Sequence, residues 1–400
     1  MGRRQTRPQV SGHQPAILVL NVGSSTLKFA LFPVTDSDDA LLRGVLEYSG
    51  SEAGRIRITD ARGRREESRA RSGTRASAVT DLLEYLKANS LFASLRSVGH
   101  RLVHGGPRFR EPVRIDADVR ASLDEVIPLA PDHLPPELGA IDEVSRVAPS
   151  LPQVACFDTA FHSTLPTVAR LFGLPRSLAA SGVVRYGFHG LSYEYVAHAL
   201  RLRGELPPRA VVAHMGNGVS VTALLDGVSV DTSMGLTPTG GVLMGTRSGD
   251  LDPGVMLYLL RSRGFSPAAL DEAVNHRGGL LGVSETSSDV RQLLDSASRD
   301  SRADDALSVF SYQVRKAIAG YAAALGGIDA LVFTAGIGEH SPDMRRRICD
   351  NLKFLGIDLD PARNSENAAT ISAAGSRVAV RIVRTNEEAM IARHTRRVIA

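Results

Sequence analysis

The chain has 400 residues, more than one hydrophobic core usually serves, so its length predicts two or more domains. Its composition is 43% hydrophobic, 22% charged and 5% aromatic, which excludes a disordered or fibrous protein. Apolar runs stay far below the roughly 20 residues that span a bilayer, so we expect no membrane segment. Two cysteines, Cys156 and Cys349, are too few for a disulfide framework, which favours a reducing, cytoplasmic location.

The formal net charge is +4, and the distribution of that charge decides its meaning. Residues 55–75 hold eight arginines against three carboxylates, a net of +5, and three arginines in residues 1–15 add +3. The rest of the chain therefore stands at −4, which is not the uniformly basic face of a nucleic-acid binder. We interpret residues 55–75 as a solvated edge hairpin or loop, and residues 1–15 as a disordered basic tail.

The predicted elements begin at Ala16. Two apolar runs flank a Gly/Ser turn and predict a hairpin that enters a mixed sheet, at residues 17–20 and 27–32. Next come a helix, a strand, a Pro-rich loop, a second helix and a second strand, at residues 80–87, 98–103, 128–136, 137–147 and 154–157. Asp158 follows the last strand, and side chains just past the carboxyl end of a strand collect at the ligand crevice of open α/β sheets.

A second strand-turn-strand unit covers residues 210–223 and repeats the pattern of the first. This repeated pattern predicts two related α/β halves around a cleft. A third Gly-rich turn, residues 335–339, follows a strand at 330–334. Three strand-end glycine turns favour phosphate binding, because glycine lets backbone N–H groups approach phosphate oxygens closely. Apolar stretches at 257–260 and 309–324 predict helix core or dimer packing.

Ten short motifs in this order resemble the signatures of acetate kinases. They cover residues 21–28, 99–106, 157–162, 185–190, 214–218, 231–235, 244–253, 287–291, 333–339 and 385–388. The run Met-Gly-Thr-Arg-Ser-Gly-Asp-Leu-Asp-Pro at 244–253 is the most specific of them. The chain is thus similar, over about residues 16–395, to acetate kinases or close short-chain acyl kinases, within the superfamily shared by sugar kinases, actin and chaperone ATPases.

The resemblance implies an α/β fold of two duplicated actin-like (ribonuclease H-like) ATPase domains, whose mixed sheets are flanked by helices around a nucleotide cleft. It places the N-terminal domain at 16–161 with 387–400 and the C-terminal nucleotide-binding domain at 162–386. The implied activity is reversible transfer of the ATP γ-phosphoryl to acetate, giving acetyl phosphate and ADP, in line between closing domains. Mg²⁺ or Mn²⁺ is the implied metal. We expect a cytoplasmic homodimer with no nucleic-acid or membrane partner.

A carboxylate acceptor is already an anion, so this reaction needs cations that oppose charge repulsion more than it needs a base. The resemblance implies that Arg101 binds the acyl carboxylate and that His189 and Arg247 stabilise the transferring phosphoryl. Asp158 is the implied acidic residue of the catalytic site; positioning of Arg101 or Mg²⁺ and proton transfer both stay open as its role. The implied metal ligands are Asn21 and Glu387.

The implied nucleotide-binding residues follow the three turns and one helix start. They are Lys28, His214, Met215, Gly216, Asn217, Gly218, Asp289, Val290, Arg291, Gly336, Ile337, Gly338, Glu339 and His340. Asp289 has an alternative role as a helix cap. His104 and His162, next to turns, fit structural hydrogen bonding at least as well as catalysis.

Some positions depart from the usual family residues, namely Leu134, Tyr193, Thr239-Gly240, Glu285-Thr286 and His340. The first two leave the preferred length of the acyl chain open. Two other classes of function stay open as alternatives. An actin-like regulatory ATPase would hydrolyse ATP whether or not short acids are present. A nucleic-acid binder using residues 55–75 would lose affinity steeply with salt.

Overall fold

The computed structural model describes residues 14–23, 26–48, 54–70, 74 and 77–400. The chain forms two compact units, one comprising residues up to Ala160 together with Asn386–Ala400, the other Phe161–Thr385. Nearly all of the predicted basic tail, residues 1–13, lies outside the described residues.

The first unit is built on an eight-stranded mixed sheet of order β5-β4-β3-β2-β1-β6-β8-β7. β1 pairs antiparallel with β2 and parallel with β6, which in turn pairs parallel with β8. These pairings confirm the predicted entrance hairpin. The strands are β1 (Ala16–Val22), β2 (Thr26–Pro33), β3 (Leu42–Glu47), β4 (Arg55–Asp60), β5 (Arg65–Arg69), β6 (Leu95–Leu102), β7 (Val113–Arg114) and β8 (Gln153–Phe157).

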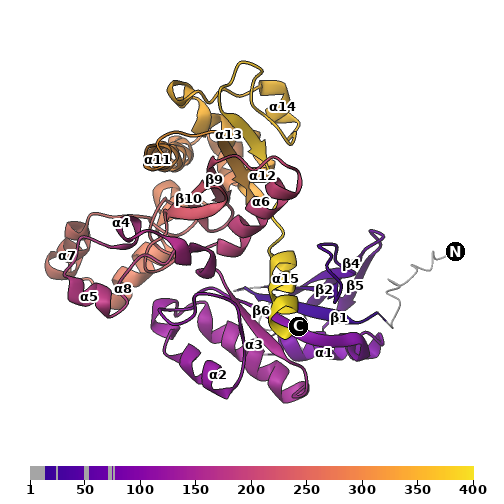
Figure 1. Ribbon diagram of the computed structural model, residues 1–400. Helices are drawn as coiled ribbons and strands as arrows, with labels where there is room; N and C mark the ends of the chain where they lie inside the picture. The colour runs from indigo at the N-terminus through magenta and orange to yellow at the C-terminus, as the bar shows by residue number, and fades with distance from the viewer. Residues whose placement is uncertain (1–13, 24–25, 49–53, 71–73, 75–76) are drawn as a thin grey trace. The chain divides into compact units, whose positions relative to one another are not determined.

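Helices bury this sheet. Apolar side chains of α1 and α3 join those of β1 to β4 in one core cluster, while α15 contacts β1 and β6 (Figure 1). Gly99 of β6 permits the close approach of α15, because a Cβ there would lie 2.3 Å from Thr395 Oγ1 and 2.7 Å from Ile391 Cγ2. The helices are α1 (Ala78–Ala88), α2 (Ala117–Asp124), α3 (Leu134–Val147) and α15 (Glu387–Ile399).

The arginine-rich segment forms the edge of the first sheet. β4 and β5 pair antiparallel, and β5 is the terminal strand, which confirms the predicted edge hairpin. β4 alternates exposed arginines with buried Ile56 and Ile58. Several of the charges are paired within the sheet: Arg55 with Glu67, Arg57 with Glu47, and Arg64 with Asp60. β4 therefore packs Ile56 and Ile58 inward and presents the Arg55 and Arg57 ion pairs on its other face. The Arg64 pair involves the buried Asp60 at the end of β4. Residues 71–73 and 75 lie outside the described residues.

The second unit is built on a five-stranded mixed sheet of order β11-β10-β9-β12-β13. β9 pairs antiparallel with β10 and parallel with β12, and β12 pairs parallel with β13. Five strands of the first sheet, β3-β2-β1-β6-β8, repeat this order and these directions. The predicted duplication and the predicted α/β fold with mixed sheets are confirmed. The strands are β9 (Arg209–Met215), β10 (Val219–Leu225), β11 (Val228–Thr232), β12 (Ala330–Thr334) and β13 (Ala379–Ile382).

Helices cover the second sheet as well (Figure 1). α6 packs against β9, β10 and β12 through an apolar cluster that includes Tyr193, Val196 and Leu200, and α11 contacts β9 and β10. The helices are α4 (Thr167–Arg170), α5 (Arg176–Ala180), α6 (Gly190–Leu202), α7 (Pro253–Ser262), α8 (Pro267–Asp271), α9 (Gly279–Ser284), α10 (Val290–Ser296), α11 (Ser301–Ala324), α12 (Ala335–His340), α13 (Pro342–Cys349) and α14 (Pro361–Ser365).

Two local predictions were wrong, and a third is narrowed. Residues 128–136 are not all loop, because α3 starts at Leu134 with Pro135 and Pro136 in its first turn, where a missing N–H breaks no helical hydrogen bond. The third glycine turn is instead the short helix α12. For residues 257–260 we expect helix core or dimer packing; they lie on α7, which buries none of its side chains in this chain, so core is excluded and dimer packing stays a prediction. Residues 309–324, by contrast, lie in α11 and contribute buried Phe310, Val314 and Ile318.

Among the described residues, no helix is both long and apolar enough to cross a membrane. Cys156 and Cys349 are both free thiols and both buried.

Candidate active site

Arg101 is the centre of a charged cluster in the first unit. It lies near the carboxyl end of β6, and Asp158 directly follows the neighbouring strand β8. The guanidinium makes a bidentate contact with Asp158, with Nη2 2.5 Å from Oδ2 and Nε 3.2 Å from Oδ1. Because a two-point contact fixes the plane of an arginine, Asp158 sets the direction in which the remaining nitrogen, Nη1, points.

That nitrogen faces two further residues. Arg101 Nη1 donates to Asn21 Oδ1 of β1 over 3.4 Å and lies 4.0 Å from Glu137 Oε1. Glu387 starts α15, whose cap is the Asn386 side chain accepting from the Ala389 N–H. Burial raises the pKa of Glu387, and the Arg101 charge opposes that rise. Asn21, Arg101, Asp158 and Glu387, expected from four separate motifs, thus belong to one cluster.

Glu137 is a member of this cluster that the sequence motifs missed. Its side chain is fully buried in the first turn of α3, with Oε2 accepting from the Val103 N–H at 2.9 Å. Oε1 has no hydrogen-bond partner among the described residues. Burial raises the pKa of Glu137 to about 8, although Arg101 acts to lower it. Its spacing from Ile141 and Val144 places the Glu137 carboxyl group on the apolar face of α3. A carboxyl group on an apolar helix face is the sequence pattern that could have identified Glu137.

The cluster holds more carboxyl groups than cationic groups. Burial acts to lower the pKa of Arg101, but the charges of Asp158, Glu387 and Glu137 outweigh burial and hold it above the usual value. Lys28 of β2, exposed, adds a positive charge that reaches Glu387. The protein thus places several carboxyl groups around one fixed arginine, an arrangement that a bound cation would stabilise.

The fit of this cluster to Mg²⁺ follows from its donor atoms. Among the described residues, no group of three or more His, Cys, Asp or Glu side chains is arranged to hold a metal ion. Mg²⁺, however, takes oxygen ligands, keeps several waters and needs only one or two protein carboxylates. The Asn21 amide oxygen and the ionised Glu387 carboxyl group are ligands of that kind, and a divalent cation would favour the ionised form of the buried Glu387.

In the second unit, two predicted turns lie at one edge of the sheet. His214 pairs with Thr334 across the parallel strands β9 and β12, so the turn after β9 and the helix α12 after β12 start at the same edge. A Cβ on Gly216 would lie 3.6 Å from Ala335 Cβ. The Met244–Arg247 loop also reaches this edge, because a Cβ on Gly245 would lie 3.3 Å from Asn217 Oδ1. Three segments distant in sequence therefore meet.

His189 is held by an unusual backbone before α6. It is the N-cap residue with φ 57°, preceded by Gly187 with φ 76°. His162 supports this turn through two hydrogen bonds. Its Nε2 lies 3.0 Å from the Phe188 carbonyl oxygen, and its Nδ1 lies 2.8 Å from Ser229 Oγ. Burial lowers the pKa of His162 to about 4. His162 is thus a neutral structural residue, and the strain at His189 marks a position that its surroundings hold in place.

His189 and Arg247 converge on the backbone of Gly218. A Cβ on Gly218 would lie 3.0 Å from His189 Nε2 and 3.7 Å from Arg247 Nη1. The His189 ring stacks on His214, with ring centroids 4.0 Å apart and planes 13° apart. A side chain at Gly218 would press on His189 Nε2 and touch Arg247 Nη1. Arg247 Nη1 also donates to the Pro238 carbonyl at 3.1 Å, which fixes its position. Two nitrogen groups near one glycine suit an anion that takes hydrogen bonds from both.

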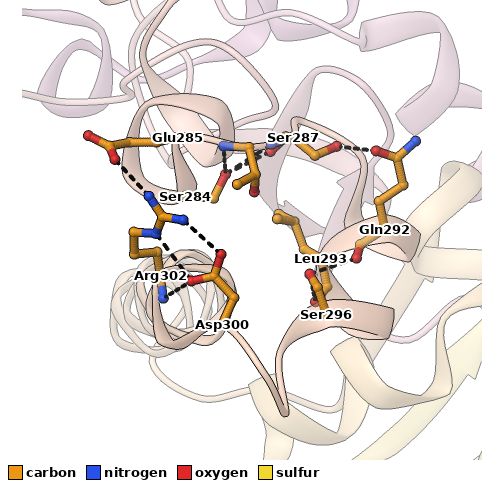
Figure 2. Close-up of polar contacts among 9 residues, drawn as sticks. Ser284, Glu285, Ser287, Gln292, Leu293, Ser296, Asp300 and Arg302 are labelled. Atoms are coloured by element: carbon orange, nitrogen blue, oxygen red, sulfur yellow. Dashed lines mark hydrogen bonds and ion pairs between the residues drawn. The ribbon is translucent and has the colours of Figure 1, made fainter.

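The segment before α10 is tied down by its own polar side chains (Figure 2). Ser284 Oγ accepts from the N–H groups of Thr286 and Ser287 and donates to the Ser287 carbonyl. Glu285, one of the departures, has φ 57° and pairs with Arg302 at 3.0 Å. Asp289 caps α10 by accepting from the Arg291 N–H at 2.8 Å, which confirms its alternative role as a helix cap.

Glu339 and Arg345 secure α12. Glu339 Oε1 accepts from the N–H groups of Ala335 and Thr385, at 2.8 and 3.1 Å. Arg345 is fully buried and donates to the Gly338 carbonyl and to both the side chain and the carbonyl of Asn364. These hydrogen bonds anchor α12, which lies where we expect the turn facing the nucleotide.

The remaining expected nucleotide residues differ in exposure. Met215, Val290 and Gly338 are buried, whereas Asn217, Arg291, Gly336 and His340 are exposed and Ile337 is intermediate. Buried members can act only through packing or backbone atoms, and exposed ones are accessible to a ligand.

Known proteins resemble the chain over nearly its whole length. The sequence profile of the Acetokinase family matches residues 16–393. An acetate kinase of Rhodopseudomonas palustris is 43% identical over 394 residues, covering 94% of this chain and 97% of the relative. One of Dichelobacter nodosus is 44% identical over 386 residues, covering 95% and 97%.

Solved structures agree. A propionate kinase from Francisella tularensis superposes with a TM-score of 0.89 at 36% identity, covering 95% of this chain and 98% of that one. Porphyromonas gingivalis acetate kinase gives 0.85 at 38% identity, covering 96% and 100%. The family expected from the ten motifs is thereby confirmed, and the chain belongs to the acetokinase family.

Proposed function

We propose that the chain is an acetate kinase, which reversibly transfers the γ-phosphoryl group of ATP to acetate and gives acetyl phosphate and ADP. The observation that carries this proposal is the convergence of His189 Nε2 and Arg247 Nη1 on Gly218. Such a pair of donors can absorb the negative charge of a phosphoryl group in transfer. Membership of the acetokinase family supplies the reaction class.

Arg101 is proposed to bind the acceptor carboxylate. Acetate and the γ-phosphoryl group are both anions, so a fixed cation lowers the cost of bringing them together. Asp158 occupies two nitrogens of the guanidinium. This contact supports a positioning role for Asp158 in preference to proton transfer, since a carboxylate acceptor has no proton to give up.

Asn21 and Glu387 are proposed to hold Mg²⁺, or Mn²⁺. When bound, the ion would screen the charge of the nucleotide phosphates. The protein's own contribution is to keep the amide oxygen of Asn21 oriented by Arg101 and to hold Glu387 at the capped start of α15.

ATP is proposed to bind in the second unit along the turn after β9, the helix α12 after β12 and the start of α10. Gly216 and Gly218 allow close approach of a ligand to the backbone. Lys28 of the first unit is the one proposed nucleotide residue outside that unit. In-line transfer with domain closure stays a prediction.

A cytoplasmic homodimer is proposed as the working form. α7 exposes a run of apolar side chains, with Val255 42%, Leu257 46% and Tyr258 55% exposed. Several exposed apolar side chains on one short helix are a common feature of interfaces between subunits. The two free, buried thiols are compatible with a reducing compartment.

A substrate panel tests the proposed activity. Enzyme, ATP and Mg²⁺ are incubated with acetate, propionate or butyrate, and the acyl phosphate is trapped with hydroxylamine. We expect acyl hydroxamate from acetate, with the comparison among acids resolving the chain-length preference that Leu134 and Tyr193 leave open. Absence of hydroxamate from every acid would contradict the proposal. ATP hydrolysis that ignores both the acid and Arg101→Ala would instead identify a regulatory ATPase.

A further inference from the structure

Tyr193 and Ser220 form a buried hydrogen-bonded chain that ends on His189. The hydroxyl oxygen of Tyr193, on α6, lies 2.5 Å from Ser220 Oγ, on β10. Ser220 Oγ in turn lies 2.8 Å from His189 Nδ1. Tyr193 and Ser220 are fully buried. Tyr193 stands at a motif position where a histidine is usual, and neither residue was among the expected site residues.

The donors and acceptors of this chain have a preferred order. Burial raises the pKa of Tyr193 above its usual value, so its hydroxyl stays protonated and can donate. Thr222 and the backbone N–H of His214 also face the Tyr193 oxygen. An N–H can only donate, and Ser220 Oγ lies 2.5 Å from the Tyr193 oxygen, so we assign the tyrosine hydrogen to Ser220 Oγ. Ser220, having accepted one hydrogen bond, can give its own hydrogen to His189 Nδ1.

This order fixes the tautomer of the imidazole. In a neutral histidine one ring nitrogen carries the proton and the other accepts. If Nδ1 accepts from Ser220, the proton is on Nε2, and Nε2 is the atom that approaches Gly218 and Arg247. A proton on Nε2 makes it a donor toward the phosphoryl group, whereas an unprotonated Nε2 would present a lone pair to an anion.

We propose that Tyr193 and Ser220 are positioning residues that hold His189 as the neutral Nε2–H tautomer, ready to donate a hydrogen bond to the transferring phosphoryl group. This proposal refines the proposed acetate kinase function and rests on it for the role of His189. The tautomer itself does not depend on that function.

The stacking of His189 on His214 disfavours a state in which both rings are charged. The rings lie nearly parallel at 4.0 Å, and two imidazolium cations so close would repel each other. His214 is itself held through Nδ1, 2.9 Å from Ser192 Oγ. Two serines thus fix the two stacked rings, each at Nδ1.

The deciding experiment is long-range ¹H–¹⁵N NMR on the full chain labelled with ¹⁵N-histidine. The His189 resonances are assigned by their absence in His189→Gln. We expect Nδ1 to resonate as an unprotonated nitrogen and Nε2 as a protonated one. In Tyr193→Phe and Ser220→Ala, both shifts should move toward values averaged over the two tautomers. Tyr195→Phe, on the same helix and half-buried, is the matched control and should leave them unchanged.

Kinetics give a second readout. Loss of one buried hydrogen bond corresponds to about a 2- to 10-fold change in an equilibrium, so we expect kcat of Tyr193→Phe and Ser220→Ala to fall by about that factor, with little change in KM for ATP. A protonated Nδ1 in the wild-type protein would overturn the proposal even if a variant failed to fold. So would unchanged His189 shifts in both variants, or equal shifts in Tyr195→Phe. If the chain showed no kinase activity but the tautomer behaved as expected, the proposed function would fail and the hydrogen-bonded chain would stand.

Discussion

Glu137→Gln tests the electrostatic description of the Arg101 cluster. Glutamine keeps the size of the side chain and an oxygen that can accept from the Val103 N–H, and it removes the charge. Burial raises the pKa of Glu137 from 4.5 to about 8, so the folded protein favours the protonated carboxyl. A raised pKa contributes stability that is complete below the unfolded value of 4.5 and is lost as the pH rises through about 8.

The size of the effect follows from that shift. Each pKa unit corresponds to about 1.4 kcal/mol, so ionising Glu137 between pH 5 and pH 9 costs the folded wild-type protein about 4 kcal/mol. The variant has no carboxyl at this position and escapes that loss. The free energy of unfolding of Glu137→Gln, relative to the wild type, should therefore rise by about 4 kcal/mol over this pH range. Other titrating groups, Glu387 among them, are common to both proteins and cancel to first order.

Urea unfolding followed by circular dichroism at pH 5, 7 and 9 measures this difference. Glu143→Gln is the matched control, because Glu143 lies on the same helix and its pKa is lowered by its hydrogen bond with Arg146. Glu143 is therefore ionised throughout this range, and its variant should show a constant difference from the wild type. A flat difference for Glu137→Gln, or one that falls with pH, would refute a buried carboxyl held protonated next to Arg101.

Two further predictions concern the second unit. Gly218→Ala should lower kcat by about 10- to 100-fold with little change in melting temperature, because its Cβ would lie 3.0 Å from His189 Nε2 and displace the reacting groups. Gly139→Ala is the control, because its Cβ meets nothing within 4 Å. Equal kcat values for the two variants would contradict the convergence of His189 and Arg247 at Gly218. Arg345→Met should destabilise the protein by about 3 kcal/mol, because buried carbonyl and amide acceptors lose their donor. In scanning calorimetry, this variant should melt at a lower temperature than Arg346→Met, the control at an exposed arginine. Equal melting temperatures would contradict the anchoring role of Arg345.

Local sequence patterns predicted what local physics determines. The apolar run of β1 and the glycine turn after β9 specify strand and turn with little help from distant residues. Motifs likewise identified Arg101, Asp158, Asn21 and Glu387 one by one, and the parallel pairing of β6 with β1 and β8 brings the first three to one edge of the sheet.

Other features depend on contacts between segments distant in sequence. Arg345 and Arg346 are consecutive, yet only Arg345 is fully buried, because its acceptors come from α12 and from the segment around α14. Arginine is seldom buried, so no pattern suggested this. Glu137 was not predicted either, because a charged side chain is seldom buried. Ser220 was not predicted because its hydrogen-bond partners lie on α6 and in the turn before α6.

The central claim is that the chain transfers a phosphoryl group to a carboxylate by means of Arg101, His189 and Arg247. ³¹P NMR of the enzyme with ATP, Mg²⁺ and acetate tests it most directly, because acetyl phosphate, ADP and inorganic phosphate give separate signals. We predict growth of the acetyl phosphate signal in step with ADP for the wild type, and loss of both in Arg101→Ala and Arg247→Ala. Inorganic phosphate appearing with ADP, without acetyl phosphate and independently of acetate, would contradict the claim.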